Sequence, residues 1–171
     1  NFSIWYNNGD IKFARRKDFL DEKDKFHGYQ KLIPYFTYCI KNLSEKYGNV
    51  IVYGELLGCC YQDTPVKNGY SKFQPFTEYT NDLEFLAFDV YMLDTHKFLN
   101  TTETHKALHN SKFKVSPILA EYNTLEDALQ HQHVFKSKLP EYFEMIDHRE
   151  ENLAEGIVIR PEENYWLGNN R

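Results

Sequence analysis

Two short stretches near the start of the chain are rich in aromatic and β-branched apolar residues, a pattern that is typical of β-strands. They cover residues 2–6 and 11–15, and the segment between them contains Asn8 and Gly9. Asn and Gly tolerate the positive φ angles that tight hairpin turns require. We therefore expect the chain to open with a β-hairpin.

Apolar residues then recur every three or four positions, the period of an amphipathic helix. They include Phe36, Ile40 and Leu43 within residues 29–47. Pro34 belongs in the first turn of such a helix, where its missing N–H breaks no hydrogen bond. The sequence therefore predicts a helix over residues 29–47, ended by Gly48.

The remaining elements are shorter. Strands are predicted over residues 50–53 (continuing through 58), 84–92 and 156–160. Helices are predicted over residues 103–110, 124–131 and 140–146. Thr124 and Asp127 form a weak capping box at the start of the second of these helices. Because strands and helices do not alternate as βαβ units, we expect an α+β fold with two antiparallel sheets flanked by helices.

Composition narrows the class of protein. A chain of 171 residues, 42% of them hydrophobic, suits one folded domain that needs no disulfide or metal to hold its core. No apolar run reaches the roughly 18 residues of a membrane helix. The net charge of −5 argues against nucleic-acid binding over the whole surface and leaves a local basic face open. Three cysteines, with Cys59 and Cys60 adjacent, favour reduced thiols in an intracellular compartment.

Two glutamates lie where a folding argument alone would not place them. Glu55 interrupts an apolar run, and a carboxylate at the end of a buried strand must be paired or used, since burying it unpaired costs several kcal/mol. Glu155 opens the predicted final strand, which ends in Arg160. Both are candidate site residues. The alternatives are a structural ion pair for Glu55 and a solvated strand end for Glu155.

Phe88 lies within the predicted strand 84–92. Taken alone, it is most simply a core aromatic residue. Strict alternation places its side chain on one face with Leu86 and Val90. The same alternation places Asp89 on the other face, together with Phe85, Ala87 and Tyr91.

Three motifs occur in a characteristic order: YGELLG at residues 53–58, EFLAFDVY at 84–91 and AEGIVIRP at 154–161. This order resembles the covalent nucleotidyltransferases, a superfamily of ATP-dependent ligases and mRNA capping enzymes. The chain looks most like the RNA ligases that seal nicks in duplex RNA, including phage enzymes and kinetoplastid RNA-editing ligases. The opening Asn1-Phe2-Ser3 resembles the residues that follow the lysine motif of these enzymes, and Arg16 stands at the spacing of their essential arginine.

The resemblance implies a reaction and its cofactors. The enzymes it points to use ATP and Mg²⁺ to join 3′-hydroxyl and 5′-phosphate RNA ends through lysyl-AMP and RNA-adenylate intermediates. It implies catalytic roles for Glu55, Glu155 and Arg16, with Glu155 also binding the metal. It further implies nucleotide binding by Phe88, stacked on adenine, by Glu55 at the ribose, and by Asn1, Arg16 and Arg160. The expected partner is RNA, in the form of a nicked duplex.

The resemblance also places two motifs outside the chain. The lysine that becomes adenylated falls before Asn1, and the terminal lysine motif falls after Arg171. We therefore expect residues 1–171 to be a partial adenylation domain of a longer protein, inactive by itself.

Two other interpretations of the function remain open. One is a DNA ligase or capping-enzyme domain, although those families usually have Asp-Gly-Glu where this chain has Tyr53-Gly54-Glu55. The other is a catalytically inactive domain that binds nucleic acid or serves as a scaffold.

Overall fold

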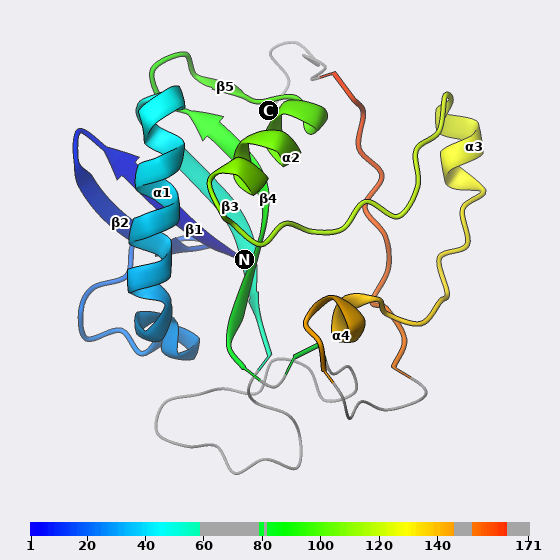
Figure 1. Cartoon of the computed structure of the whole chain (residues 1–171), viewed down its shortest axis with the longest axis horizontal. Coiled ribbons are helices and arrows are strands. Elements are labelled where there is room, and N and C mark those ends of the chain that lie inside the picture. The colour runs from blue at the N-terminus through cyan, green and yellow to red at the C-terminus, as the bar shows by residue number, and fades with distance from the viewer. Residues whose placement is uncertain (59–78, 81, 146–151, 164–171) are drawn as a thin grey trace.

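A computed structural model describes residues 1–58, 79–80, 82–145 and 152–163 (Figure 1). The described residues contain one antiparallel sheet with the strand order β2-β1-β3-β4-β5. Its strands are β1 (Phe2–Asn7), β2 (Asp10–Arg15), β3 (Val50–Leu57), β4 (Glu84–Met92) and β5 (Lys97–Phe98). The α+β class is confirmed. In place of the two sheets expected from the sequence, this part of the chain forms a single five-stranded one.

Helices cover one face of this sheet (Figure 1). The helices of the described residues are η1 (Phe26–Leu32, a 3₁₀-helix), α1 (Ile33–Tyr47), α2 (Thr101–Asn110), α3 (Leu125–Leu129) and α4 (Leu139–Tyr142). Helices α1 and α2 lie against the sheet. The core between these helices and the sheet contains the fully buried Ile4, Phe36, Ile40, Val52 and Leu108. Among the described residues, none of the helices is both long and apolar enough to span a bilayer.

The predicted hairpin is confirmed. Strands β1 and β2 pair from Phe2 opposite Arg15 to Asn7 opposite Asp10. Asn8 and Gly9 form the turn with φ angles of 50° and 92°. These left-handed angles are the reason that Asn and Gly are suited to the two positions.

The long helix begins later than predicted. Residues 26–32 form the 3₁₀-helix η1, and the α-helix starts at Ile33. Pro34 explains the boundary, because it has no N–H to donate to the carbonyl four residues earlier. The Ile33 N–H instead bonds the carbonyl oxygen of Gln30, three residues back. Pro34 thus lies in the first turn of α1, as expected.

The shorter helices are confirmed in type and corrected in extent. Helix α2 starts at Thr101, two residues early, because the Asn100 side chain caps it by accepting from the Glu103 N–H at 2.8 Å. Helix α3 is shorter than predicted, but Thr124 caps it by accepting from the Asp127 N–H at 3.1 Å. Helix α4 is a single turn that begins at Leu139, one residue before the predicted segment 140–146, and ends at Tyr142.

The predicted final strand, residues 156–160, is wrong. This segment pairs with no strand in the part of the chain that the structure describes, and Val158 is 85% exposed. A strand needs a neighbour with unpaired backbone groups, and the nearby edge of β4 is already used. Residues Tyr91 and Met92 pair with β5 there, and Ala87 forms a bridge with Val115.

Candidate functional site

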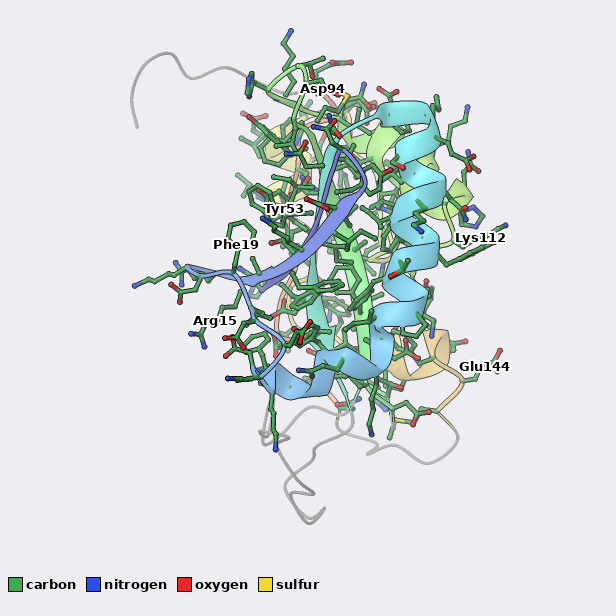
Figure 2. The ribbon with its side chains drawn as sticks, turned by 90° about the vertical axis from the view of Figure 1, so that its left-hand side faces the viewer. Arg15, Phe19, Tyr53, Asp94, Lys112 and Glu144 are labelled. Carbon is green, nitrogen blue, oxygen red and sulfur yellow. The ribbon has the colours of Figure 1, made fainter. Side chains whose placement is uncertain are left out.

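The sheet has a second face, opposite α1, which we call the site face and define by Ser3, Trp5, Tyr53, Glu55 and Asp89. Directly opposed residues of paired strands point to the same face. Ser3 opposes Tyr53, and Tyr53 opposes Asp89. Tyr53 and Phe19 accordingly lie on the side of the sheet away from α1 (Figure 2). The candidate site is built on this face.

A β-bulge in β4 brings Phe88 to the site face. Tyr53 pairs with Asp89 while the next residue, Gly54, pairs with Ala87, so Phe88 is an extra residue with no partner. Ala87 and Val90 both lie in the core although three positions separate them. The alternation expected for Phe88 and Asp89 is therefore wrong, because a bulge shifts the pattern by one residue. Phe88 is half-buried and is no part of the core.

Phe88 lines a pocket of about 180 Å³, which we call the Phe88 pocket. Its other walls include Asn1, Tyr53, Asp89 and Phe98. Tyr53 and Phe98 have ring centroids 6.0 Å apart. Aromatic rings around a small pocket suit a planar base, because every nucleobase has a flat π-face that can stack on an aromatic ring.

Gly54 is required by the packing of β3 on β4. A Cβ atom at this position would overlap the Phe85 ring and the Leu86 carbonyl oxygen. The glycine therefore allows a close approach, as the sequence suggested, and the approaching groups belong to β4.

Glu55 is exposed, in contrast to the buried carboxylate expected from its apolar neighbours. Its side chain is 59% exposed, because the alternation of β3 turns it to the site face. The Asn1 nitrogen lies 4.0 Å from its Oε1 atom. No side-chain ion pair among the described residues holds Glu55, so the structural ion pair considered as an alternative is absent from this part of the chain.

Glu155 lies close to Glu55, although 100 residues separate them in sequence. Partial desolvation raises the pKa of the Glu155 carboxyl, and the nearby Glu55 charge raises it further. The Tyr79 hydroxyl opposes this effect by donating a hydrogen bond to Glu155. The pKa of Tyr79 is itself raised, first by burial and then by the Glu155 and Glu55 charges. Glu155 is exposed to solvent, and the Tyr79 hydroxyl and the Glu55 carboxylate are its neighbours there.

Arg160 holds the bulge from the C-terminal segment. Its Nη1 atom donates to the Phe88 carbonyl oxygen at 2.7 Å, and its Nη2 atom donates to the Asp89 carboxylate. Its charge also adds to the burial that lowers the pKa of His105 on α2. Arg160 thus contacts the backbone of the residue that lines the Phe88 pocket.

Arg16 lines a second, larger pocket of about 300 Å³, which we call the Phe19 pocket. The two pockets adjoin, because Asn1, Phe2 and Tyr53 line both. The structure thus gathers Phe88, Asn1, Glu55 and Glu155 in one region. Arg16 lies in the neighbouring pocket, and Arg160 lies at the bulge, bonded to the Phe88 carbonyl oxygen and the Asp89 carboxylate.

Four residues of this region were not singled out from the sequence: Tyr53, Tyr79, Asp89 and Phe98. Tyr53 and Asp89 belong to two of the family motifs, so the motifs could have pointed to them. Phe98 belongs to a two-residue strand that no periodicity reveals. Tyr79 is brought to Glu155 by the tertiary fold alone.

No group of three or more His, Cys, Asp or Glu side chains that could hold a metal ion occurs among residues 1–58, 79–80, 82–145 and 152–163. Glu55 and Glu155 form a pair of carboxylates. The Cys39 thiol is free and buried, whereas Cys59 and Cys60 lie outside the described residues.

Comparison with known proteins identifies the family. The family model for RNA ligases matches residues 1–171, the whole chain. The chain belongs to the RNA ligase family. RNA-editing ligase 1, mitochondrial, of Trypanosoma brucei brucei is 28% identical over 201 aligned positions, covering 94% of this chain and 42% of the relative. The chain thus spans about two fifths of the length of that curated RNA ligase.

Solved structures confirm the fold. A mutant of Naegleria gruberi RNA ligase with ATP and Mn matches with a TM-score of 0.53 and 17% identity, over 80% of this chain and 38% of that one. The same ligase with pyrophosphate matches to the same extent. This RNA ligase chain therefore shares the fold of those proteins. Membership of the family favours an RNA ligase over the DNA ligase and capping-enzyme readings.

Proposed function

We propose that the protein carrying this chain is an ATP-dependent RNA ligase, and that its nucleotide binds in the Phe88 pocket. The observation that carries the proposal is the bulge in β4, which removes Phe88 from the core and turns it toward Asn1 and Tyr53 on the site face. Bulges of this kind re-aim a side chain and are over-represented beside active sites. A core role for Phe88 would require no such irregularity.

Each site residue has a role that fits its position. Phe88 stacks on the adenine ring, and Asn1 contacts the nucleotide across the pocket from it. Glu55 is exposed beside Asn1, where its carboxylate accepts hydrogen bonds from ribose hydroxyls. Arg160 fixes Phe88 through the strand backbone and adds positive charge near the nucleotide.

The carboxylate pair suits Mg²⁺. Two like charges held close together with partial desolvation raise the pKa of Glu155, and a bound cation relieves that repulsion. Mg²⁺ is usually held by one or two carboxylates together with substrate phosphates, so Glu155, supported by Glu55, is a sufficient protein contribution. When bound, the ion neutralises charge on the phosphates of ATP.

The nucleophile is a lysine outside this chain, preceding Asn1 in the whole protein. Only Lys25 fits the letters of a KxxG motif here, and it lies at the start of η1, lining neither pocket. The lysine amine attacks the α-phosphorus of ATP, so that a P–N bond forms and the P–O bond to pyrophosphate breaks. Arg16 and Asn1 help to hold the phosphates and the RNA end, because this chemistry depends on positioning and charge stabilisation.

Labelled ATP tests the proposal. The whole protein is incubated with Mg²⁺ and ATP labelled at the α- or the γ-phosphate, then separated under denaturing conditions. We expect label from the α-phosphate alone on the protein, and sealing of a nicked RNA duplex when it is added. An unlabelled protein that leaves the nick open, under conditions where it is folded, contradicts the proposal and favours the inactive scaffold reading.

A further inference from the structure

The Phe19 pocket has an aromatic wall that the nucleotide site does not use. Phe19 is 55% exposed, and its ring stands edge-on to Trp5 with centroids 5.1 Å apart. The loop after β2 holds it there through a bridge between Ala14 and Phe19 and a hydrogen bond from the Leu20 N–H to the Phe13 carbonyl at 2.8 Å. A large apolar ring is thus fixed at the surface beside a pocket.

Basic side chains surround the same pocket. Arg15, Arg16 and Lys17 are consecutive lining residues, and the Lys12 Nζ atom lies 5.9 Å from the centre of the Phe19 ring. Asp18 is the acid of this pocket, and it pairs with Arg15 at 3.3 Å. Within the part of the chain that the structure describes, no ion pair involves Arg16 or Lys17. Three consecutive basic side chains thus line this pocket in a chain of net charge −5.

The position of the pocket is the third observation. It shares Asn1, Phe2 and Tyr53 with the Phe88 pocket, so ligands in the two pockets would be neighbours. Figure 2 shows Phe19, Arg15 and Tyr53 on the same side of the sheet, away from α1. A joining enzyme must hold its activating nucleotide next to an RNA end. Two adjoining pockets on one face provide that arrangement.

We propose that the Phe19 pocket binds one unpaired nucleotide of the RNA substrate, with its base against Phe19 and the adjacent phosphates against Arg16 and Lys17. The inference rests on the proposed RNA ligase function. An exposed ring supplies a stacking surface that tolerates any base, and lysine and arginine side chains follow the backbone of a single strand. Lys12 adds a cation over the face of the same ring.

The test uses the whole protein and a short single-stranded oligouridylate carrying a fluorescent label. Binding is followed by anisotropy for wild type, Phe19→Leu, which keeps an apolar side chain without a ring, and Phe19→Tyr, which keeps the ring. We expect Phe19→Leu to weaken binding about tenfold and Phe19→Tyr to stay within about twofold of wild type. Lys17→Ala should reduce the slope of log affinity against log salt by about 0.7, the value for one phosphate contact on a single strand.

A matched control and a second readout make the result decisive. Tyr38 on α1 is similarly exposed, at 57%, on the other side of the sheet, so Tyr38→Ala should bind RNA as wild type does. Labelling with α-labelled ATP is measured for the same proteins, and Phe19→Leu should lose more RNA affinity than labelling. Wild-type RNA affinity in Phe19→Leu, or an equal loss of both activities, overturns this inference. Absent labelling with Phe19-dependent RNA binding would instead overturn the ligase proposal.

Discussion

At the scale of single residues, Phe88 shows how a backbone irregularity turns an ordinary apolar side chain into a candidate ligand contact. Its sequence neighbourhood predicts a core residue, and only the unequal count of residues in β3 and β4 removes it from the core. The family motif proposes Phe88 as a site residue, whereas periodicity alone places it in the core. Neither the motifs nor the periodicity predicts the contact between Glu155 and Tyr79, because only the fold brings these two residues together.

Phe88→Ala should raise the KM for ATP about tenfold to a hundredfold, because stacking on a base contributes about 1–3 kcal/mol. Glu155→Ala should nearly abolish adenylation, because charge stabilisation is usually the largest catalytic contribution. Steady-state labelling with ATP in the whole protein measures both effects, and thermal melts accompany it. If Phe88→Ala unfolds the protein while Glu155→Ala keeps full activity, the nucleotide site is misassigned.

Gly54→Ala should destabilise the protein by about 1–3 kcal/mol, the usual cost of forcing extra atoms into a packed interior. The added methyl group would overlap the Phe85 ring and the Leu86 carbonyl oxygen. Urea unfolding measures the change. In a Phe85→Leu background the penalty of Gly54→Ala should shrink, and an unchanged penalty in that background would show that the ring is not the obstacle.

At the scale of elements, the sequence patterns predicted the hairpin, the body of α1 and strands β3 and β4. They failed where the local rule is broken by a partner distant in sequence. The segment 156–160 has the composition of a strand, yet β5 and Val115 occupy the edge of β4, so it is held instead by Arg160. Composition records what a segment is able to form, whereas pairing depends on which edge is available.

The Arg160–Asp89 contact should couple this segment to β4 by about 1 kcal/mol in a double-mutant cycle followed by urea unfolding. Their side chains are only 35% and 19% exposed, which limits screening by solvent. The Arg15–Asp18 pair, at 47% and 61%, is the matched control and should couple by about 0.3 kcal/mol. Equal coupling energies in the two cycles would argue that Arg160 does not anchor the segment.

Helix α2 should make the protein sensitive to mild acid through His105. Burial, assisted by the Arg160 charge, lowers the pKa of His105 from its ordinary value of 6.5, so the folded state resists a proton that the unfolded state accepts. The unfolded state then binds more protons below about pH 6.5, and stability falls as the pH falls. His105→Gln should therefore lose less stability than wild type between about pH 7.5 and 5.5 in urea titrations.

His109, exposed on the same helix, provides the control for this experiment. The His109→Gln profile shows how far the replacement of an exposed histidine on α2 changes the dependence on pH by itself. Parallel pH profiles for wild type and His105→Gln would show that His105 has no part in acid sensitivity.

At the scale of the whole molecule, one face of the sheet carries the core and the other carries the candidate site. Helices α1 and α2 bury the first face (Figure 1). The bulge, the carboxylate pair and the two adjoining pockets lie on the second. Residues from β1, β3, β4 and the segment after α4 meet there. This proximity follows from the topology of the sheet, and no single element predicts it.

The structure of the whole protein with ATP and Mg²⁺ bound tests the central claim most directly. The account predicts the adenine ring in the Phe88 pocket against Phe88, the ribose beside Glu55 and the metal ion near Glu155. A nucleotide bound elsewhere, with Phe88 out of contact with the adenine ring, would contradict it.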